Sequence, residues 1–247
     1  MVESAAGCVK VYRRDEDSSD YDELGEAIVG EAAGSNFGHS VSIAADGETL
    51  VIGAPSDSSY VRDSGKAMIY RFDDTTESWK PLGQELHGGD ANAKFGWSVA
   101  LSGNGSILAI SAPFSGSDDS GYVTVYRFAK DELSWIKLGE NISGLRGEQE
   151  GDSIDLSTDG NVLVIGTKNN QDNGYKSGRA VVYRWDEAIE DYNQMGNYVT
   201  GQTHGDEFGA SVALSLDGLL LAVGTGTRPT RSGYVQVYKL ENATLFD

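Results

Sequence analysis

The residue types that most often carry chemistry are few in this chain or are scattered along it. Its three histidines, His39, His87 and His204, lie far apart and at different positions of the internal repeat, whereas a zinc site needs three or four converging ligands. We therefore expect isolated surface imidazoles and no metal site. The sequence contains no nucleophile elbow, no glycine-rich phosphate loop and no cysteine pair. These features favour a protein that is not an enzyme and holds no cofactor.

Carboxylates are plentiful, so an acid pair of the kind that glycosidases use remains an alternative. A carbohydrate-active or other hydrolytic function would need at least two convergent carboxylates at the central axis of the fold. Asp155 is the acidic residue that departs from the repeat pattern of the innermost strands, where the other copies have Ser42, Ala100 and Ala213. We expect Asp155 to make a structural hydrogen bond there.

Loops of variable length are the better candidates for ligand binding. The segments that join the second and third strand of each repeat, 56–63, 114–119, 169–176 and 227–231, differ in length, and three of them are rich in Asp and Asn. Binding residues concentrate on loops that a rigid scaffold holds in place. The predicted ligand-binding face, which also includes the inter-repeat loops such as 30–36, contains Asp57, Asp63, Asp118, Asp119, Asn169, Asn170, Asp172, Arg228 and Arg231. The alternative is that these segments are ordinary hydrophilic turns, or bind calcium weakly.

The composition excludes some partners. A net charge of −19 disfavours nucleic acid and anionic membranes, because both are polyanions. No stretch approaches the roughly 18 apolar residues that a membrane span needs. Cys8 is the single cysteine, so no disulfide forms within the chain. The start, MVESAAG, lacks the apolar core of a signal peptide, which indicates an intracellular protein or an excerpt of a longer one.

The elements that must position these residues come from a repeat of about 57 residues. Four segments align without gaps, beginning at Asn36, Lys94, Glu150 and Glu207, and the third lacks the phenylalanine of the others. A motif of the type GYVTVYRF occurs five times, and its tyrosine precedes an aromatic residue by nine positions in four copies. Such constant spacing indicates one hairpin geometry in every copy.

Each repeat is predicted to form four antiparallel strands. In the first complete copy, residues 40–44 alternate apolar and small side chains, 50–53 are almost wholly apolar, and two further strands carry Ala67, Ile69 and Tyr70, then Trp79 and Leu82. Asp-Gly or Asn-Gly pairs mark a hairpin turn between the first two strands of each copy. Tandem sheets of this kind predict an all-β propeller in which the blades pack face to face. The repeated aromatic residues, from Tyr12 and Tyr21 onwards, are expected to fill the space between blades.

We expect one propeller domain over 1–247, with a partial blade at 1–30, complete blades at 36–90, 94–146 and 150–203, and a partial blade of three strands at 207–247. Five blade positions are favoured. The alternative is a fragment of a larger ring, because simple closure would duplicate the third strand.

The residues also carry a family resemblance. Phe37-Gly38 followed by Gly53-Ala54-Pro55 resembles the FG-GAP repeat of integrin α-chain propellers. The segment from Leu24 to Pro55 is similar to acidic cell-surface arrays of marine microbes and algae. The resemblance implies an extracellular or cell-surface module for adhesion or scaffolding, which binds a protein, a glycan or neighbouring repeats. Its integrin members bind calcium in a loop that is absent here, since the turn at Asp46-Gly47 offers one acidic side chain and calcium prefers about six to eight oxygen ligands. The remaining alternatives are the hydrolytic propeller and a purely structural array unit.

Overall fold

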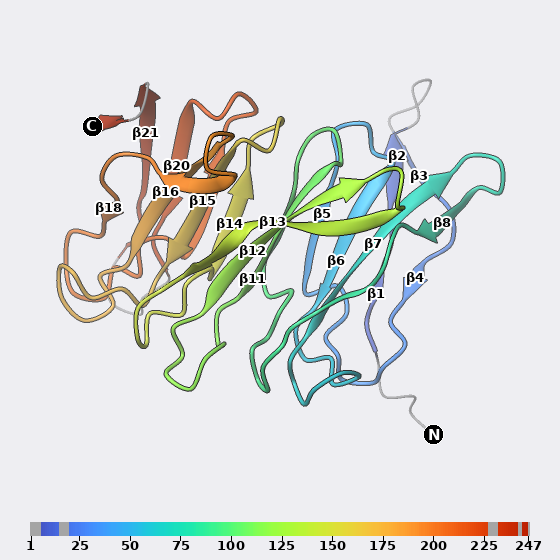
Figure 1. Ribbon diagram of the computed structural model, residues 1–247, viewed down its shortest axis with the longest axis horizontal. Helices are drawn as coiled ribbons and strands as arrows, with labels where there is room; N and C mark the ends of the chain where they lie inside the picture. Colours follow the sequence, from blue (N-terminus) through green and yellow to red (C-terminus); the bar gives the residue numbers. More distant parts are fainter. Residues whose placement is uncertain (1–5, 15–19, 227–231, 242–243, 247) are drawn as a thin grey trace.

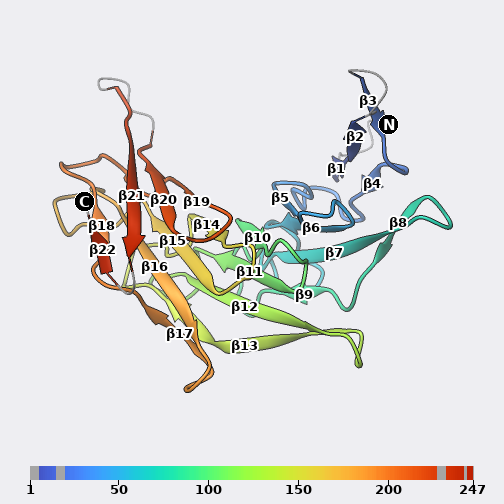
Figure 2. The same cartoon turned by 90° about the horizontal axis from the view of Figure 1, so that it is seen from above.

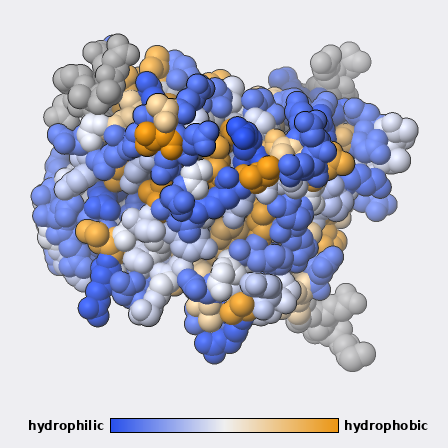
Figure 3. Space-filling view, viewed as in Figure 1, coloured by the Kyte–Doolittle hydropathy of each residue, from blue (hydrophilic) through white to orange (hydrophobic). Residues whose placement is uncertain are grey.

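The chain folds into β-strands alone over the residues that the computed structural model describes, 6–14, 20–226, 232–241 and 244–246. The strands form antiparallel sheets that follow one another along the chain in an arc (Figures 1 and 2). No helix in these residues is long and apolar enough to cross a membrane. The surface seen in Figure 3 is mainly hydrophilic, with apolar residues scattered over it, as the acidic composition predicts.

The sheets repeat one strand order. The first unit pairs β1 (Cys8–Val9) with β4 (Ile28–Val29) and β2 (Tyr12–Arg14) with β3 (Tyr21–Glu23). The second contains β5 (Ser40–Ile43), β6 (Thr49–Ala54), β7 (Lys66–Asp73), β8 (Ser78–Pro81) and β9 (Leu86–His87). The third contains β10 (Val99–Leu101), β11 (Ile107–Ala112), β12 (Tyr122–Ala129) and β13 (Ser134–Ser143). The fourth contains β14 (Ser153–Leu156), β15 (Val162–Thr167), β16 (Arg179–Asp186), β17 (Asp191–Gln194) and β18 (Val199–Thr200). The fifth contains β19 (Ser211–Leu214), β20 (Leu220–Gly224), β21 (Val235–Glu241) and β22 (Thr244–Phe246).

The last sheet differs from the expectation of three strands. The chain turns back after β21, and β22 pairs with it through Lys239 and Phe246, which adds a short fourth strand. Over the described residues no ladder joins the first unit to the last, and the two lie at opposite ends of the arc (Figure 2).

The predicted Asp-Gly hairpins are confirmed, but only the glycine adopts a left-handed backbone. Gly47 has a φ of 73°, and the Asp46 carboxylate instead accepts the Glu48 N–H at 2.9 Å. The corresponding turns at Asn104, Asp159 and Asp217 make the same bond at 3.0, 2.9 and 3.0 Å. A short polar side chain thus satisfies a turn N–H, while glycine adopts the positive φ without strain.

The core lies in the seams between neighbouring sheets. One apolar cluster fills each seam; that between the second and third units joins Ala67 and Ile69 of β7 to Val99, Leu108 and Ile110 of the next sheet. The aromatic residues do fill these seams at Trp79, Trp135 and Tyr192. Tyr12 and Tyr21 are exceptions, with 53% and 67% of their surface exposed, because no sheet covers their side of the first unit. The expectation that these two rings lie in the core is therefore wrong.

Candidate functional site

Several of the loops predicted to share one face are hydrogen-bonded to each other in the described part of the chain, which leaves out 227–231. The loop after β11 is joined by hydrogen bonds to the loop that leads into β14, from Gly147 N to Asp118 O at 2.8 Å and from Gln149 N to Asp119 O at 3.0 Å. The loop after β6 is joined in the same way to the loop that leads into β10, through Lys94 N and Asp63 O at 3.3 Å. Much of the polar character of this face is therefore used to connect one blade to the next.

The predicted ligand residues have several different environments. Asp57 is buried at 1% exposure, where one carboxylate oxygen accepts the Ser59 N–H and hydroxyl and the other lies 3.7 Å from Lys66 Nζ. Asp63 is paired with Lys94 at 2.9 Å. Asn169 donates to Gln149, and Asp118 and Asp119 contribute backbone carbonyls. Arg228 and Arg231 lie outside the described residues. The remaining two, Asn170 and Asp172, belong to a cluster around Arg179.

This cluster begins with a substitution in the repeat. Gly65 forms a β-bridge to Phe95 and Gly178 to Phe208, and at the same position Gly121 forms a bridge to Glu150. Glu150 is 1% exposed, the same as Phe95. A glutamate thus occupies the core position that phenylalanine fills in the other FG motifs, at the seam between the third and fourth units.

Arg179, the first residue of β16, compensates the charge. Its Nη2 donates to Glu148 Oε2 at 2.9 Å and to Glu150 Oε2 at 3.2 Å, and its Nη1 lies 4.0 Å from Asp172 Oδ2. Two carboxylates therefore converge on one guanidinium nitrogen. Such charge-assisted bonds are the strong kind, and they are needed because an unpaired buried charge is costly.

Glu148 is held by further donors. Asn170 Nδ2 donates to its Oε1 at 2.9 Å, and Leu145 N donates to its Oε2 at 2.9 Å. Asn170 is completely buried, so its amide holds the Glu148 carboxylate from the interior of the protein. Three donors, from Arg179, Asn170 and Leu145, therefore fix the orientation of the Glu148 carboxylate.

Burial raises the pKa of Glu150, and the neighbouring Arg179 opposes this rise without reversing it. The pKa of Arg179 is raised in turn, because Glu150 and Glu148 outweigh the opposing effect of burial. Glu150 Oε1 and Arg179 Nε are buried and make no hydrogen bond. A carboxyl group with a raised pKa beside a cation in a partly dry site is typical of functional sites.

The cluster is open to solvent at one end. The side chains of Arg179 and Glu148 keep 13% and 10% of their surface exposed, and that of Asp172 keeps 40%. The exposed ring of Tyr198 lies 5.5 Å from the Arg179 guanidinium. Tyr198 also lines a hollow of about 530 Å³ together with Thr200, Gln202, Gln236 and Tyr238, among others. Arg179 and Glu148 thus keep a small solvent-exposed surface near an aromatic ring, whereas Glu150 has almost none.

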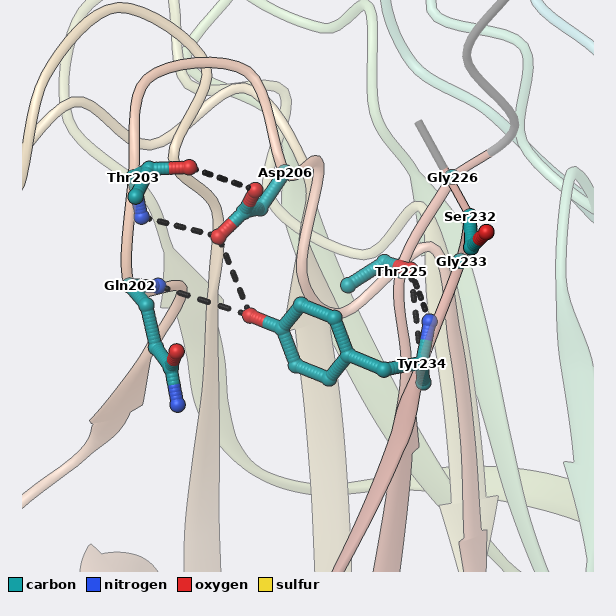
Figure 4. Close-up of a pocket in the computed structure, with 8 residues that line it drawn as sticks. All are labelled: Gln202, Thr203, Asp206, Thr225, Gly226, Ser232, Gly233 and Tyr234. Carbon is teal, nitrogen blue, oxygen red and sulfur yellow. Dashed lines mark hydrogen bonds between the residues drawn. The ribbon is translucent and has the colours of Figure 1, made fainter. Parts of the chain in front are cut away.

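The next seam carries a related arrangement (Figure 4). Tyr234, at the position of Arg179, donates to Asp206 Oδ2 at 3.0 Å, and Thr203 donates to both Asp206 oxygens at 2.8 Å. Burial raises the pKa of Asp206, but these hydrogen bonds outweigh it and the net shift is downward. The cavity around them has a volume of about 210 Å³. These bonds join the loop at Thr203 to the segment that leads into β21, so we assign Asp206 a structural role.

Asp155 makes the structural bond that was expected. Its Oδ2 accepts the Leu214 N–H of the next sheet at 2.7 Å, as Ser42 Oγ accepts the Leu101 N–H at 3.0 Å. Its Oδ1 also accepts its neighbour's N–H, from Leu156, at 2.9 Å. The corresponding residue of the preceding sheet, Ala100, has no side-chain acceptor for the Leu156 N–H. Asp155 therefore accepts one N–H from its own sheet and one from the next sheet. Among the described residues, no group of three or more His, Cys, Asp or Glu could hold a metal ion.

The fold defines an all-β, propeller-type protein. Residues 30–70 match the family model described as FG-GAP repeat, so the chain carries FG-GAP-like repeats, as the motifs indicated. A search of curated proteins finds no relative of similar sequence.

Several solved structures share the fold. A putative 6-phosphogluconolactonase from Bacteroides uniformis superposes with a TM-score of 0.63 at 15% identity, over 96% of this chain and 63% of that one. A putative 6-phosphogluconolactonase from Bacteroides fragilis gives 0.61 at 15% identity, over 97% and 63%. The periplasmic gluconolactonase of Pseudomonas aeruginosa gives 0.56 at 17% identity, over 96% and 61%. The chain thus spans less than two thirds of the length of these proteins.

These similarities correct two expectations from the sequence. The sequence favours a non-catalytic binding, adhesion or scaffolding module without enzymatic activity, whereas the similar structures are named as lactonases. The hydrolytic alternative agrees better with them. Glu148 and Glu150 converge on Arg179 at the seam between the third and fourth units, whereas this alternative asks for a carboxylate pair at the propeller axis.

The sequence-based prediction missed Glu148, Glu150 and Arg179. One signal was available: the repeat that lacks the phenylalanine has a glutamate at its place. An acidic residue at a buried core position needs a nearby cation, and Arg179, the first residue of β16, supplies it.

Proposed function

We propose that this protein is a hydrolase of the propeller type that opens a sugar lactone or a related ester of a sugar acid. The observation that carries the proposal is the convergence of Glu148 and Glu150 on Arg179 Nη2, at 2.9 and 3.2 Å, in a seam with one accessible end. The names of the structurally similar lactonases support it, but at 15–17% identity they support the fold more than the substrate.

In the proposed reaction a water molecule attacks the lactone carbonyl carbon while Glu148 takes its proton. Arg179 stabilises the oxyanion that forms, since a guanidinium in a partly dry site is a strong electrostatic partner. The bond between the carbonyl carbon and the ring oxygen then breaks, and the proton passes from Glu148 to the ring oxygen. One lactone and one water thus yield one hydroxy acid. Glu150 touches no substrate; it is a positioning residue that holds Arg179.

The sugar ring would lie against Tyr198. Aromatic faces and side-chain amides are usual partners for sugar rings and hydroxyls, and Tyr198, Gln202 and Gln236 all line the same hollow. A glycan-derived small molecule therefore fits this site better than a large protein partner.

The test is hydrolysis of δ-gluconolactone and of 6-phosphogluconolactone by the full chain, followed as acid release in a pH-stat. We expect turnover above the spontaneous rate, and a loss on the order of 100-fold or more in kcat for Glu148→Gln. Arg179→Lys should also lose activity, because a lysine has a single nitrogen and cannot contact Glu148 and Glu150 with one nitrogen while a second faces Asp172. Glu85→Gln is the matched control, since Glu85 pairs with Lys66 at another seam. No turnover of either lactone, or equal activity in all variants, would refute the proposal.

An extracellular or cell-surface location stays a separate proposal. Asn104 and Asn141 lie in N-glycosylation patterns and are both exposed. Expression in a glycosylating secretory host followed by removal of N-glycans tests it; no mass change at these two asparagines would count against secretion in such a host.

A further inference from the structure

The last sheet exposes residues that are buried in every complete blade. Val235 and Val237 of β21 are 67% and 65% exposed. The residues at the same positions of the third strand in the three complete blades are all 0–3% exposed. They are Ala67 and Ile69 in β7, Val123 and Val125 in β12, and Ala180 and Val182 in β16. The difference arises because each inner sheet packs against the next, and nothing in the described residues packs against β21 on this side.

The first unit exposes the other half of such a seam. Tyr12 and Tyr21 are 53% and 67% exposed. Their counterparts in the inner sheets include Tyr70 at 7%, Trp79 at 9% and Trp135 at 3%. These counterparts face the preceding sheet.

An inner seam shows how the two halves fit. In the cluster between the second and third units, Ala67 and Ile69 of β7 pack with Trp135 and the partly buried Tyr126. The exposed Val235 and Val237 correspond to Ala67 and Ile69, and the exposed Tyr12 and Tyr21 correspond to Tyr126 and Trp135. The chain therefore carries at its two ends the two complementary faces of a contact that it also builds internally.

We propose that this chain associates head to tail with a second copy, so that the Val235–Val237 face of one molecule packs on the Tyr12–Tyr21 face of the other. A second copy is the occupant because it supplies the complementary face in the register already used at the inner seams. A contact between two unlike faces is heterologous, so it leaves one free face at each end and extends to longer assemblies unless the rotation closes a ring.

Sedimentation velocity of the full chain over a range of concentrations tests this. We expect the average mass to rise with concentration, and we expect Val237→Asp and Tyr21→Asp each to give monomers, because a charge is placed in an apolar contact. An equimolar mixture of the two variants should form dimers and nothing larger, because each retains the face that the other lacks. If instead each face packed on an identical face of a second copy, the variant that keeps that face intact would still associate on its own.

Ile189→Asp is the control, since Ile189 is 56% exposed at a hairpin tip away from both faces. It should associate like the unmodified chain, and thermal unfolding should show that all three variants are folded. A monomeric chain at every soluble concentration overturns the proposal. So does continued association of either face variant alone, or failure of the mixed variants to pair.

Discussion

Glu150 occupies in its repeat the place that Phe95 occupies in the preceding one. A Cβ built on Gly144 would lie 2.6 Å from the Glu150 Cβ, as one built on Gly88 would lie 2.8 Å from the Phe95 Cβ. The backbone around the two residues is therefore the same, and the difference is a buried carboxyl group in place of a ring. Arg179 binds this carboxyl group together with that of Glu148.

Glu150→Phe should be tolerated or stabilising. Replacing a buried ionic group with an apolar side chain that fits is often neutral or favourable by about 1–4 kcal/mol, and Arg179 keeps Glu148 as its partner. Urea denaturation should show an equal or higher free energy of unfolding than the unmodified chain. A large loss would mean that the seam does not accept a ring as the others do.

Arg179→Met should have the opposite effect. It removes the cation from two buried carboxylates, and breaking a buried pair from one side costs about 3–5 kcal/mol. The same urea titration measures it, and the double variant with Glu150→Phe should recover part of the loss. If Arg179→Met proved as stable as the unmodified chain, the ion pairs would not support this seam.

The pH dependence of stability should carry a signature of Glu150. Burial raises its pKa in the folded state above the ordinary glutamate value of 4.5, so the folded state binds more protons than the unfolded chain within that interval. The free energy of unfolding should therefore fall as pH rises from about the ordinary value through the raised pKa. Other carboxylates titrate in the same range, so the quantity to plot is the difference between the unmodified chain and Glu150→Phe. A flat difference between pH 4 and pH 8 would contradict the raised pKa.

The sequence allowed the blades to be predicted because their causes are local. The alternation in β5, the apolar run of β6 and the Asp46-Gly47 turn each need only neighbouring residues, and they recur. β22 was missed because it follows the last recognisable motif. The exposure of Tyr12 and Tyr21 depends on whether another sheet covers them, which no local pattern encodes.

The site was less accessible to prediction for a related reason. Asn170 and Asp172 were chosen for their loop, and they do lie beside Arg179. Glu148 and Arg179, however, are far apart in sequence and meet because the loop into one blade folds over the first residue of that blade's third strand. Their proximity could have been predicted only by aligning the repeats position by position, starting from the repeat that lacks the phenylalanine.

Gly96→Ala should be strongly destabilising. Gly96 has a φ of 85°, and a Cβ there would lie 2.5 Å from the Lys66 carbonyl oxygen in the adjacent blade. The left-handed backbone and the overlap each cost about 1–3 kcal/mol. Gly89→Ala is the matched control, because a Cβ at Gly89 meets nothing within 4 Å. Thermal unfolding should separate the two clearly, and equal midpoints would show that the second–third seam can open without cost.

Asp155 offers a graded test of the link between the fourth and fifth sheets. Asp155→Ala leaves the Leu214 and Leu156 N–H groups without their acceptor, and an unsatisfied buried donor costs about 1–3 kcal/mol. Asp155→Ser should cost less, because Ser42 at the corresponding position accepts the Leu101 N–H of its neighbouring sheet. Hydrogen exchange at Leu214 reports the bond directly, and it should be fastest in the alanine variant and intermediate in the serine variant. If exchange at Leu214 were the same in all three proteins, the carboxylate would not join the two sheets, and the role assigned to Asp155 would be wrong.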